Sequence, residues 1–174
     1  LFHAAREAFG HSFPNYCPLR LATRICIDHY WSLQGIRFYT GIPDPGHSAF
    51  WNKFWTSKLG TIGHRGVTVY SRFLRYRNQE VKLPNGTKYS VLVAEEKGID
   101  VRIALDVIRT ARKNEFDVAI IFSQDQDFSE LADEIRALAQ EQNRWIKIVS
   151  AFPASPTSNN KRGINNTDWI KIDR

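Results

Sequence analysis

The sequence predicts an α/β fold with a mostly parallel central sheet and a β-hairpin extension. Segments with strand-like and helical patterns alternate along the chain, which is typical of layered α/β folds. Val118–Phe122 is a continuous apolar run, as expected of a parallel strand that is buried on both faces. Pro84-Asn85-Gly86 lies between two strand-like segments and is a turn signal, so it predicts the hairpin.

Proline and glycine residues divide the first half of the chain. The predicted helices, each followed by a glycine, cover residues 1–9, 18–33 and 47–59. The predicted strands, rich in β-branched and aromatic residues, cover residues 36–40, 67–77 and 88–94. The hairpin extension is assigned to residues 67–94. On the helix over residues 47–59, we expect Phe50 and Phe54 to lie in the core.

The second half of the chain repeats the alternation. The predicted helices cover residues 99–113 and 129–142. The predicted strands cover residues 117–122, 145–151 and 169–172. Residues 153–166 are polar and are predicted to form a loop before the last strand.

Length and composition favour one globular domain over residues 1–174. Of the 174 residues, 43% are hydrophobic and 24% are charged, values that exclude a wholly disordered protein. No apolar run approaches the ~20 residues that cross a bilayer, so we expect no membrane partner. Cys17 and Cys26 are too few for a disulfide framework, and no signal-peptide pattern is found, so we expect a reducing, cytoplasmic location.

Charge is uneven along the chain, whose net charge is +6. Residues 1–98 contain 13 Lys and Arg against 6 Asp and Glu, a net charge of +7, whereas residues 99–174 contain 11 against 12, a net charge of −1. This division favours a protein that binds a polyanion with one region and places metal ions with another. The alternative is an ordinary basic protein with solvated lysines.

A carboxylate lies in the first turn of the helix predicted over residues 99–113. Asp100 falls within the apolar stripe of that helix when residues are plotted at about 100° each, which places it on the buried face and favours a role in a site. The alternative is a helix-terminal interaction worth about 0.3–1 kcal/mol. Asp106 falls beside Arg102 and Arg109, so we expect it on a solvated face with local ion pairs.

A second group of carboxylates directly follows the apolar run. In Ser123-Gln124-Asp125-Gln126-Asp127-Phe128, both aspartates lie at the carboxyl edge of the predicted sheet, where α/β folds bind ligands. Neighbouring carboxylates repel each other unless a cation, a proton or helix N–H groups compensate. Capping of the next helix is the alternative. With Asp100 predicted at the same edge, the pattern favours a Mg²⁺ or Mn²⁺ site, because oxygen ligands suit these ions.

Clustered carboxylates with a divalent metal are typical of phosphodiester hydrolysis. The metal lowers the pKa of an attacking water and neutralises charge on the leaving oxygen. Histidine is not required as a base in this chemistry. The histidines, whose spacing indicates neither a metal site nor a catalytic triad, are His3, His11, His29, His47 and His64.

Lys97-Gly98-Ile99-Asp100, a helix, and then the segment from Ser123 to Phe128 resemble the NYN domain family, a branch of the PIN-like, flap-nuclease-like ribonucleases. The likeness is clearest over residues 90–172, including the closing segment Asn166-Thr167-Asp168-Trp169-Ile170. The resemblance implies a three-layer α/β/α PIN-like, Rossmann-like fold and Mg²⁺- or Mn²⁺-dependent endoribonuclease activity. It also implies that Asp100, Asp125 and Asp127 are catalytic metal ligands and that Ser123 orients a ligand or phosphate.

One part of the family pattern is not in the sequence. Family members usually open with a central strand that ends in Asp-Gly-x-Asn, whose Asp completes the acidic site. This chain begins with Leu1-Phe2, which resembles the family's residues immediately after that motif. We expect upstream residues to supply the strand, because an unfilled central position would leave backbone groups unpaired in the core.

Basic and aromatic residues are interleaved over the helix at residues 47–59 and the hairpin. Such a mixture suits single-stranded RNA, whose bases stack on rings and whose phosphates pair with cations. The alternative is that the aromatic residues belong to the core. The residues that we expect to contact RNA are Lys97, Ser123, Arg65, Arg72, Arg75 and Arg77.

The leading hypothesis is therefore a metal-dependent endoribonuclease that hydrolyses RNA phosphodiester bonds. The second hypothesis is a non-catalytic RNA-binding or interaction module with a degenerate site. A third is another metal-dependent phosphotransfer enzyme with an Asp-x-Asp motif, such as a Toprim-like or nucleotide-sugar enzyme. A homodimer or a larger complex is compatible with each.

Overall fold

The computed structural model of the chain describes residues 2–10 and 16–173. Two compact units make up the chain. The hairpin unit comprises Cys17–Arg102, and the three-strand unit combines Leu1–Tyr16 with Ile103–Arg174. Helix α4 (Ile99–Arg112) begins in the hairpin unit and continues into the three-strand unit. Each unit has a hydrophobic core of its own.

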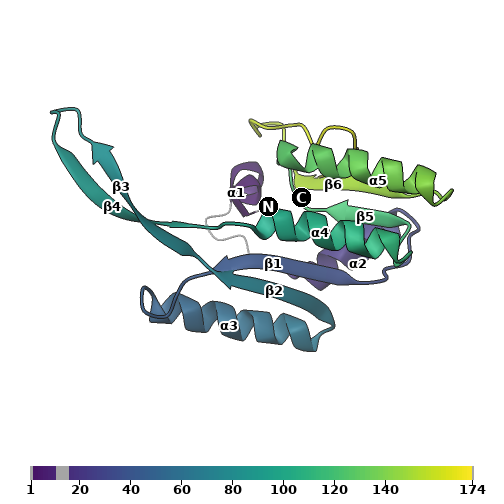
Figure 1. The fold of residues 1–174 in the computed structure, drawn as a ribbon, viewed down its shortest axis with the longest axis horizontal. Coiled ribbons are helices and arrows are strands. Elements are labelled where there is room, and N and C mark those ends of the chain that lie inside the picture. Colours follow the sequence, from purple (N-terminus) through teal and green to yellow (C-terminus); the bar gives the residue numbers. More distant parts are fainter. Residues whose placement is uncertain (1, 11–15, 174) are drawn as a thin grey trace. The chain divides into compact units, whose positions relative to one another are not determined.

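The hairpin unit is built on a β-α-β element. Strands β1 (Ile36–Ile42) and β2 (Val67–Phe73) pair in parallel along their whole length. Helix α3 (Ala49–His64) connects the two strands and lies along one side of the pair, as Figure 1 shows. The buried residues that join the helix to the strands are Ile42, Leu59, Ile62 and Val67.

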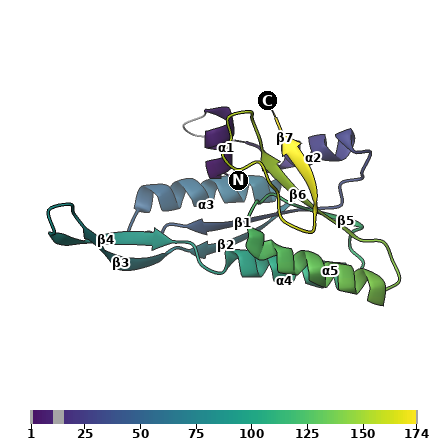
Figure 2. The same ribbon diagram turned by 90° about the horizontal axis from the view of Figure 1, so that it is seen from above.

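An antiparallel hairpin follows β2, with its turn at the predicted Pro84-Asn85-Gly86. Strand β3 (Arg75–Lys82) pairs with β4 (Lys88–Glu95) along its whole length. Figures 1 and 2 both show this two-stranded ribbon projecting beyond the β1–β2 pair. The basic side chains of β3 are therefore carried on an extended arm of the hairpin unit.

The start of the hairpin differs from the predicted one. The sequence predicted one strand over residues 67–77, whereas the structure divides these residues at Leu74. The Leu74 N–H donates to a carbonyl at the end of β1 at 2.9 Å. Pairing with β1 ends there, and the chain then changes partner. Arg72 therefore belongs to the parallel pair, whereas Arg75 and Arg77 belong to the hairpin.

Helix α3 is apolar on two sides, which corrects the prediction for its phenylalanines. Leu59 and Ile62 are in the core, and Trp55 packs against them. Phe50 and Phe54, expected in the core, are instead 73% and 44% exposed. On a helical wheel at about 100° per residue, the core positions lie at roughly 220–300° from the first residue of the helix. The two phenylalanines lie at about 100–140°, so they point to a different side.

The three-strand unit contains a parallel sheet. In the order β5-β6-β7, its strands are Val118–Ile121, Lys147–Pro153 and Asp168–Ile172. The sequence predicted that the apolar run at residues 118–122 is buried on both faces. β5 is instead mostly half-buried, and the central strand β6 is almost entirely buried. Helix α5 (Ser129–Glu141) contacts β6, and Figure 2 shows α1 (Phe2–Phe9) on the other side of that strand.

Helix α2 (Pro18–Asp28) ends before its predicted limit at residue 33. After the helix, Tyr30 takes a left-handed conformation with a φ of 57°. The N–H of Trp31 then bonds to the carbonyl of Cys26 at 2.8 Å, which is the six-to-one bond of a Schellman ending. Because the left-handed residue is tyrosine and not glycine, the sequence carried no signal for this ending.

The predicted fold class is confirmed as α/β with several parallel strands. Strands alternate with helices in the predicted order, and β3 with β4 forms an antiparallel exception. Within residues 2–10 and 16–173, every helix is too short or too polar to cross a membrane.

The two cysteines are free thiols in different environments. Cys17 directly precedes α2, and its thiol has a lowered pKa. The N–H of Arg20 is the main cause, and the N–H of Leu19 and the charge of Arg65 add to it, which together outweigh desolvation. Cys26 is buried in α2, and burial raises the pKa of its thiol.

We expect iodoacetamide to alkylate Cys17 faster than Cys26, and from a lower pH. Alkylation consumes the thiolate, so a lowered pKa moves the rise in rate toward neutral pH and a raised pKa moves it the other way. Timed labelling between about pH 6 and 9, read by mass spectrometry of the two tryptic peptides, measures both rates. In urea the rates should converge. Equal rates in the folded chain would contradict the assignment.

Candidate metal centre and nucleic-acid interface

The Asp-x-Asp segment lies where β5 ends. A short turn leads from β5 into the single 3₁₀ turn η1 (Gln126–Phe128), which continues into α5. Phe128 is buried and anchors this turn in the core. Asp125 and Asp127 are both exposed. The two carboxylates therefore lie at the carboxyl edge of the parallel sheet.

Local hydrogen bonds hold the backbone of this segment. The Asp125 N–H donates to Ser123 Oγ at 3.1 Å, and the Asp127 N–H donates to Asp125 Oδ1 at 3.0 Å. Asp125 thus caps η1, which is the structural role considered from the sequence. The carboxylate of Asp127 makes no hydrogen bond or ion pair within the part of the chain that the structure describes.

The two glutamines of the segment bind the loop that precedes β7. Gln124 Nε2 donates to two carbonyls of this loop, at 2.9 and 3.3 Å. Gln126 Nε2 donates to a third at 3.0 Å, and Gln126 Oε1 accepts from the N–H of Asn165 at 3.0 Å. The three carbonyls belong to Asn160, Arg162 and Gly163. The glutamines thus bind residues 160–165, while the aspartate that follows each of them stays exposed.

The same loop is packed closely onto the sheet. Ser150 is fully buried in β6, and its hydroxyl donates to the carbonyl of Ser123 at 2.6 Å. A Cβ atom at Gly163 would lie 2.8 Å from Ser150 Oγ and 2.6 Å from a ring carbon of Trp169. The Trp169 indole N–H donates to the carbonyl of Ile164 at 2.9 Å. Only glycine fits at position 163 without displacing these groups.

The third predicted ligand, Asp100, belongs to the hairpin unit. It is exposed in the first turn of α4, directly after the buried Ile99, so the expectation of a buried face is wrong. A helical side chain covers the turn on the N-terminal side of its own Cα, and at this position no such turn exists. The meeting of Asp100 with Asp125 and Asp127 stays a prediction.

Asp106 also differs from its prediction. Its ion pair with Arg109, at 3.6 Å, agrees with the expected local pairing. Asp106 is nevertheless only 4% exposed, and Thr110, one turn later, is buried as well. The apolar stripe of α4 packs against the core as predicted. The side of α4 that carries Asp106 and Thr110 is also buried, so the predicted solvated face around Asp106 is wrong.

The basic residues predicted to contact RNA are all exposed, namely Arg65, Arg72, Arg75, Arg77 and Lys97. Arg77 and Lys97 form ion pairs with one carboxylate, that of Glu95. Arg72 Nη1 donates to the carbonyl of Lys97 at 3.4 Å, at the approach to α4. Exposed ion pairs contribute about 0–1 kcal/mol, so phosphates can compete for these cations at small cost.

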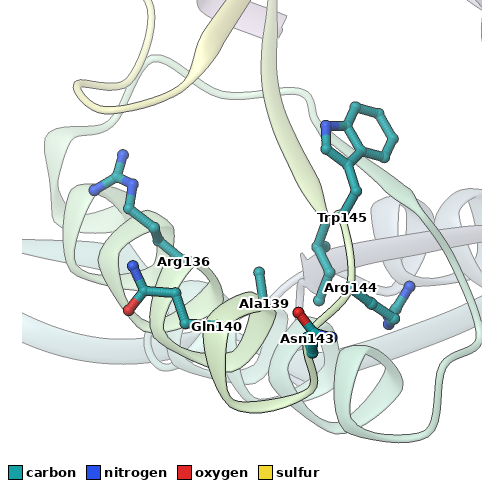
Figure 3. A pocket seen from close by; sticks show the side chains of 7 residues that line it. Arg136, Ala139, Gln140, Asn143, Arg144 and Trp145 are labelled. Atoms are coloured by element: carbon teal, nitrogen blue, oxygen red, sulfur yellow. The ribbon is translucent and has the colours of Figure 1, made fainter.

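An open hollow of about 440 Å³ lies at the amino end of β6. Figure 3 shows its walls, formed by the last turns of α5 and the segment leading into β6, with Arg136 and Trp145 on opposite sides. The Arg144 guanidinium donates to two backbone carbonyls, at 2.9 and 3.2 Å, and to Asp117 at 3.1 Å. No carboxylate lines the hollow, so it does not offer a site for a cation.

The donor chemistry of the Asp-x-Asp edge fits a hydrated hard cation. Two exposed carboxylates, one residue apart, supply the oxygen ligands that Mg²⁺ and Mn²⁺ prefer. Among the residues that the structure describes, no three His, Cys, Asp or Glu side chains gather into a group that could hold a metal ion. Asp125 and Asp127 alone would bind such an ion weakly, and a further oxygen ligand would be needed for tight binding.

Sequence reasoning missed the residues that support this edge. Ser150 had a signal, because it is the one hydroxyl in the apolar run Ile148–Phe152. Gln124 and Gln126 carried no local sequence signal, because their partners are backbone groups that lie 36–39 residues away in the chain. A single sequence does not reveal such pairing.

Gln126→Ala should release the loop over residues 160–165. Two hydrogen bonds to the loop are lost, and each contributes about 0.5–1.5 kcal/mol, so we expect the free energy of unfolding to fall by about 1–3 kcal/mol. Trypsin reports the release directly, because cleavage after Lys161 and Arg162 should accelerate several-fold. Gln140→Ala, which removes an exposed glutamine of α5, is the control. Equal cleavage of the two variants would show that Gln126 does not hold the loop.

Gly163→Ala and Gly60→Ala should change stability in opposite directions. The added methyl group at position 163 meets Ser150 and Trp169, so we expect a loss of about 1–3 kcal/mol. Gly60 lies inside α3 with no atom within 4 Å of an added Cβ, so alanine should add about 0.5–1 kcal/mol. Urea unfolding followed by circular dichroism measures both. A stable Gly163→Ala variant would contradict the close packing.

Comparison with known proteins places the chain in a family. The family model of the NYN domain matches residues 36–165, which run from β1 through η1 to the loop before β7. The match includes Asp100, Asp125 and Asp127, and the closing segment from Asn166 lies outside it. No curated protein and no solved structure gives a significant match. Because the family model covers well over half of its residues, the chain belongs to the NYN domain family, whose members are generally nuclease-like and act on RNA.

Proposed function

We propose that this protein is a Mg²⁺- or Mn²⁺-dependent endoribonuclease. The observation that carries the proposal is the exposed pair Asp125 and Asp127 at the carboxyl edge of a parallel sheet, in a chain of the NYN family. Asp100 is the proposed third ligand. The family pattern also includes an upstream Asp, and a strand carrying it would complete the acidic site.

The chain's own residues have separate parts in the proposed reaction. Asp125 and Asp127 would hold the divalent ion, which supplies an activated water and charge neutralisation at the leaving oxygen when bound. Ser123 fixes the backbone of Asp125, and the two glutamines fix the loop beside it. The exposed cations of the hairpin unit, Arg75 and Arg77 among them, would hold the RNA phosphates.

Several further parts of the proposal are inferred from membership of the NYN domain family. The central sheet is proposed to form a three-layer α/β/α sandwich of PIN-like type, with residues 1–174 as one domain. The RNA is proposed to be single-stranded and the location cytoplasmic, and a homodimer or larger complex is compatible with the proposal. The net charge of +7 on residues 17–102, which contain 13 Lys and Arg against 6 Asp and Glu, supports binding of a polyanion.

A second candidate is a non-catalytic RNA-binding or interaction module. The observation that favours it is that, among the described residues, no three His, Cys, Asp or Glu side chains gather into a group that could hold a metal ion. This candidate predicts salt-dependent RNA binding without metal-dependent cleavage. An RNA cleavage experiment separates the two.

The test is cleavage of a single-stranded RNA by the full-length protein, with Mn²⁺ or with chelator. Asp125→Asn and Asp127→Asn remove one charge each, and asparagine at position 125 keeps the capping oxygen. Loss of several kcal/mol of transition-state stabilisation predicts a fall in rate of about 100-fold or more. The control is Asp117→Asn, which removes the same charge before β5 begins.

The chelator should abolish cleavage, and the control should leave it intact. Cleavage that survives both the chelator and the two aspartate substitutions would refute a metal-dependent site at this edge. Salt-sensitive RNA binding with no cleavage under any metal would favour the second candidate.

A further inference from the structure

The aromatic side of α3 is the feature that neither the fold nor the acidic edge uses. Phe50, Trp51 and Phe54 are 73%, 47% and 44% exposed, although each could contribute to a core. Their ring centroids follow one another at 5.2 and 5.5 Å, in edge-to-face contacts. Burying such a side chain is worth about 1.5–3 kcal/mol, so stability alone does not explain their exposure. These three residues form the α3 aromatic surface.

Positive charge accompanies these rings. Lys58 Nζ lies 5.9 Å from the centroid of Phe54 and 5.2 Å from that of Trp55, within the range of cation–π attraction. Lys53 is exposed on the same helix. Helix α3 contains no Asp or Glu at all. The α3 aromatic surface therefore combines stackable rings with lysines of the same helix.

The start of α3 is also joined to the hairpin. His47, two residues before the helix, stacks on Tyr76 of β3 with ring centroids 3.7 Å apart and an interplanar angle of 6°. Both rings belong to the hairpin unit. The contact brings the base of the basic arm next to the start of α3, so cations of the arm begin close to the helix that carries the rings.

We propose that the α3 aromatic surface binds single-stranded RNA by base stacking, with Lys53 and Lys58 pairing with phosphates. This inference rests on the proposed RNA function and adds a binding site distant in sequence from the acidic edge. Every base has a face that stacks on an aromatic ring, and single strands expose those faces whereas duplexes do not. The site is therefore selective for strandedness and tolerant of sequence.

A second copy of the chain fits this surface less well. In a symmetric contact each α3 would meet the α3 of its partner, and lysines would face lysines. No carboxylate on the helix could compensate that repulsion. RNA supplies both the flat apolar partner for the rings and the negative charge for the lysines. Charge complementarity therefore favours RNA as the occupant.

Binding is tested with a short fluorescein-labelled oligouridylate in chelator, on the full chain carrying Asp125→Asn so that no cleavage occurs. Phe50→Ala and Phe54→Ala should each weaken binding about 5- to 100-fold, as expected for one lost stacking contact. The salt dependence of binding should not change, because no phosphate contact is removed. Trp145→Ala, which removes an exposed tryptophan of the three-strand unit, is the matched control.

Two further measurements separate stacking from other contacts. Phe54→Leu keeps an apolar side chain without a ring, so it should bind RNA as weakly as Phe54→Ala. An abasic oligomer of equal phosphate number should bind the variants and the parent chain alike. Circular dichroism verifies that each variant folds, as the exposure of these side chains leads us to expect.

Three results would overturn the proposal. The first is a change of less than about twofold in oligouridylate affinity in both alanine variants. Loss of one stacked base should lower the affinity by about fivefold or more. The second is full affinity in Phe54→Leu. The third is a loss of self-association in sedimentation with RNA affinity unchanged, which would assign the surface to a second copy. Because binding is measured without cleavage, failure of the nuclease proposal leaves each of these results readable.

Discussion

The hydrogen bonds between two glutamines and the loop over residues 160–165 are the constraint on which the acidic edge depends. Gln124 and Gln126 bind this loop, while Asp125 and Asp127 are exposed and do not bind it. Residues 126–128 form a 3₁₀ turn, so the cap by Asp125 holds this backbone together with the glutamine bonds. The exposed carboxylates are thus a consequence of how the loop is held.

Helix α3 has two apolar sides. One side connects and packs on β1 and β2, and the other exposes aromatic rings to solvent. Trp55, Leu59 and Ile62 provide the side that packs on β1 and β2. Phe50, Trp51 and Phe54 lie outside that core and stay exposed, which is the observation behind the proposed binding surface. Exposed apolar side chains favour self-association. Lysines beside them oppose it in a symmetric contact, which would bring the lysines of the two copies into one interface.

Periodicity and turn chemistry predicted most elements of the fold, because these signals are local. The hairpin turn, the helix beginning at Pro18 and the strand before Ser123 were all recognisable from neighbouring residues. The errors arose where a contact distant in sequence determines the end of a strand or the burial of a side chain. Leu74 ends β2 by bonding to β1, and Asp106 is covered by packing that no local pattern records. The position of Asp125 and Asp127 at the carboxyl end of β5 was predictable from the sequence, whereas the side chains that hold this segment depend on tertiary contacts.

Capping and metal binding were considered from the sequence as alternatives for Asp125, but the geometry makes them compatible. The cap uses one carboxylate oxygen, Oδ1, as the acceptor of one N–H. An ionised carboxylate has about four lone-pair positions, so most of its capacity remains. The cap also fixes the orientation of the group and offsets part of its charge repulsion with Asp127, because the N–H of Asp127 is the donor. A capping bond therefore orients a carboxylate for a cation, and its presence does not argue against a ligand role.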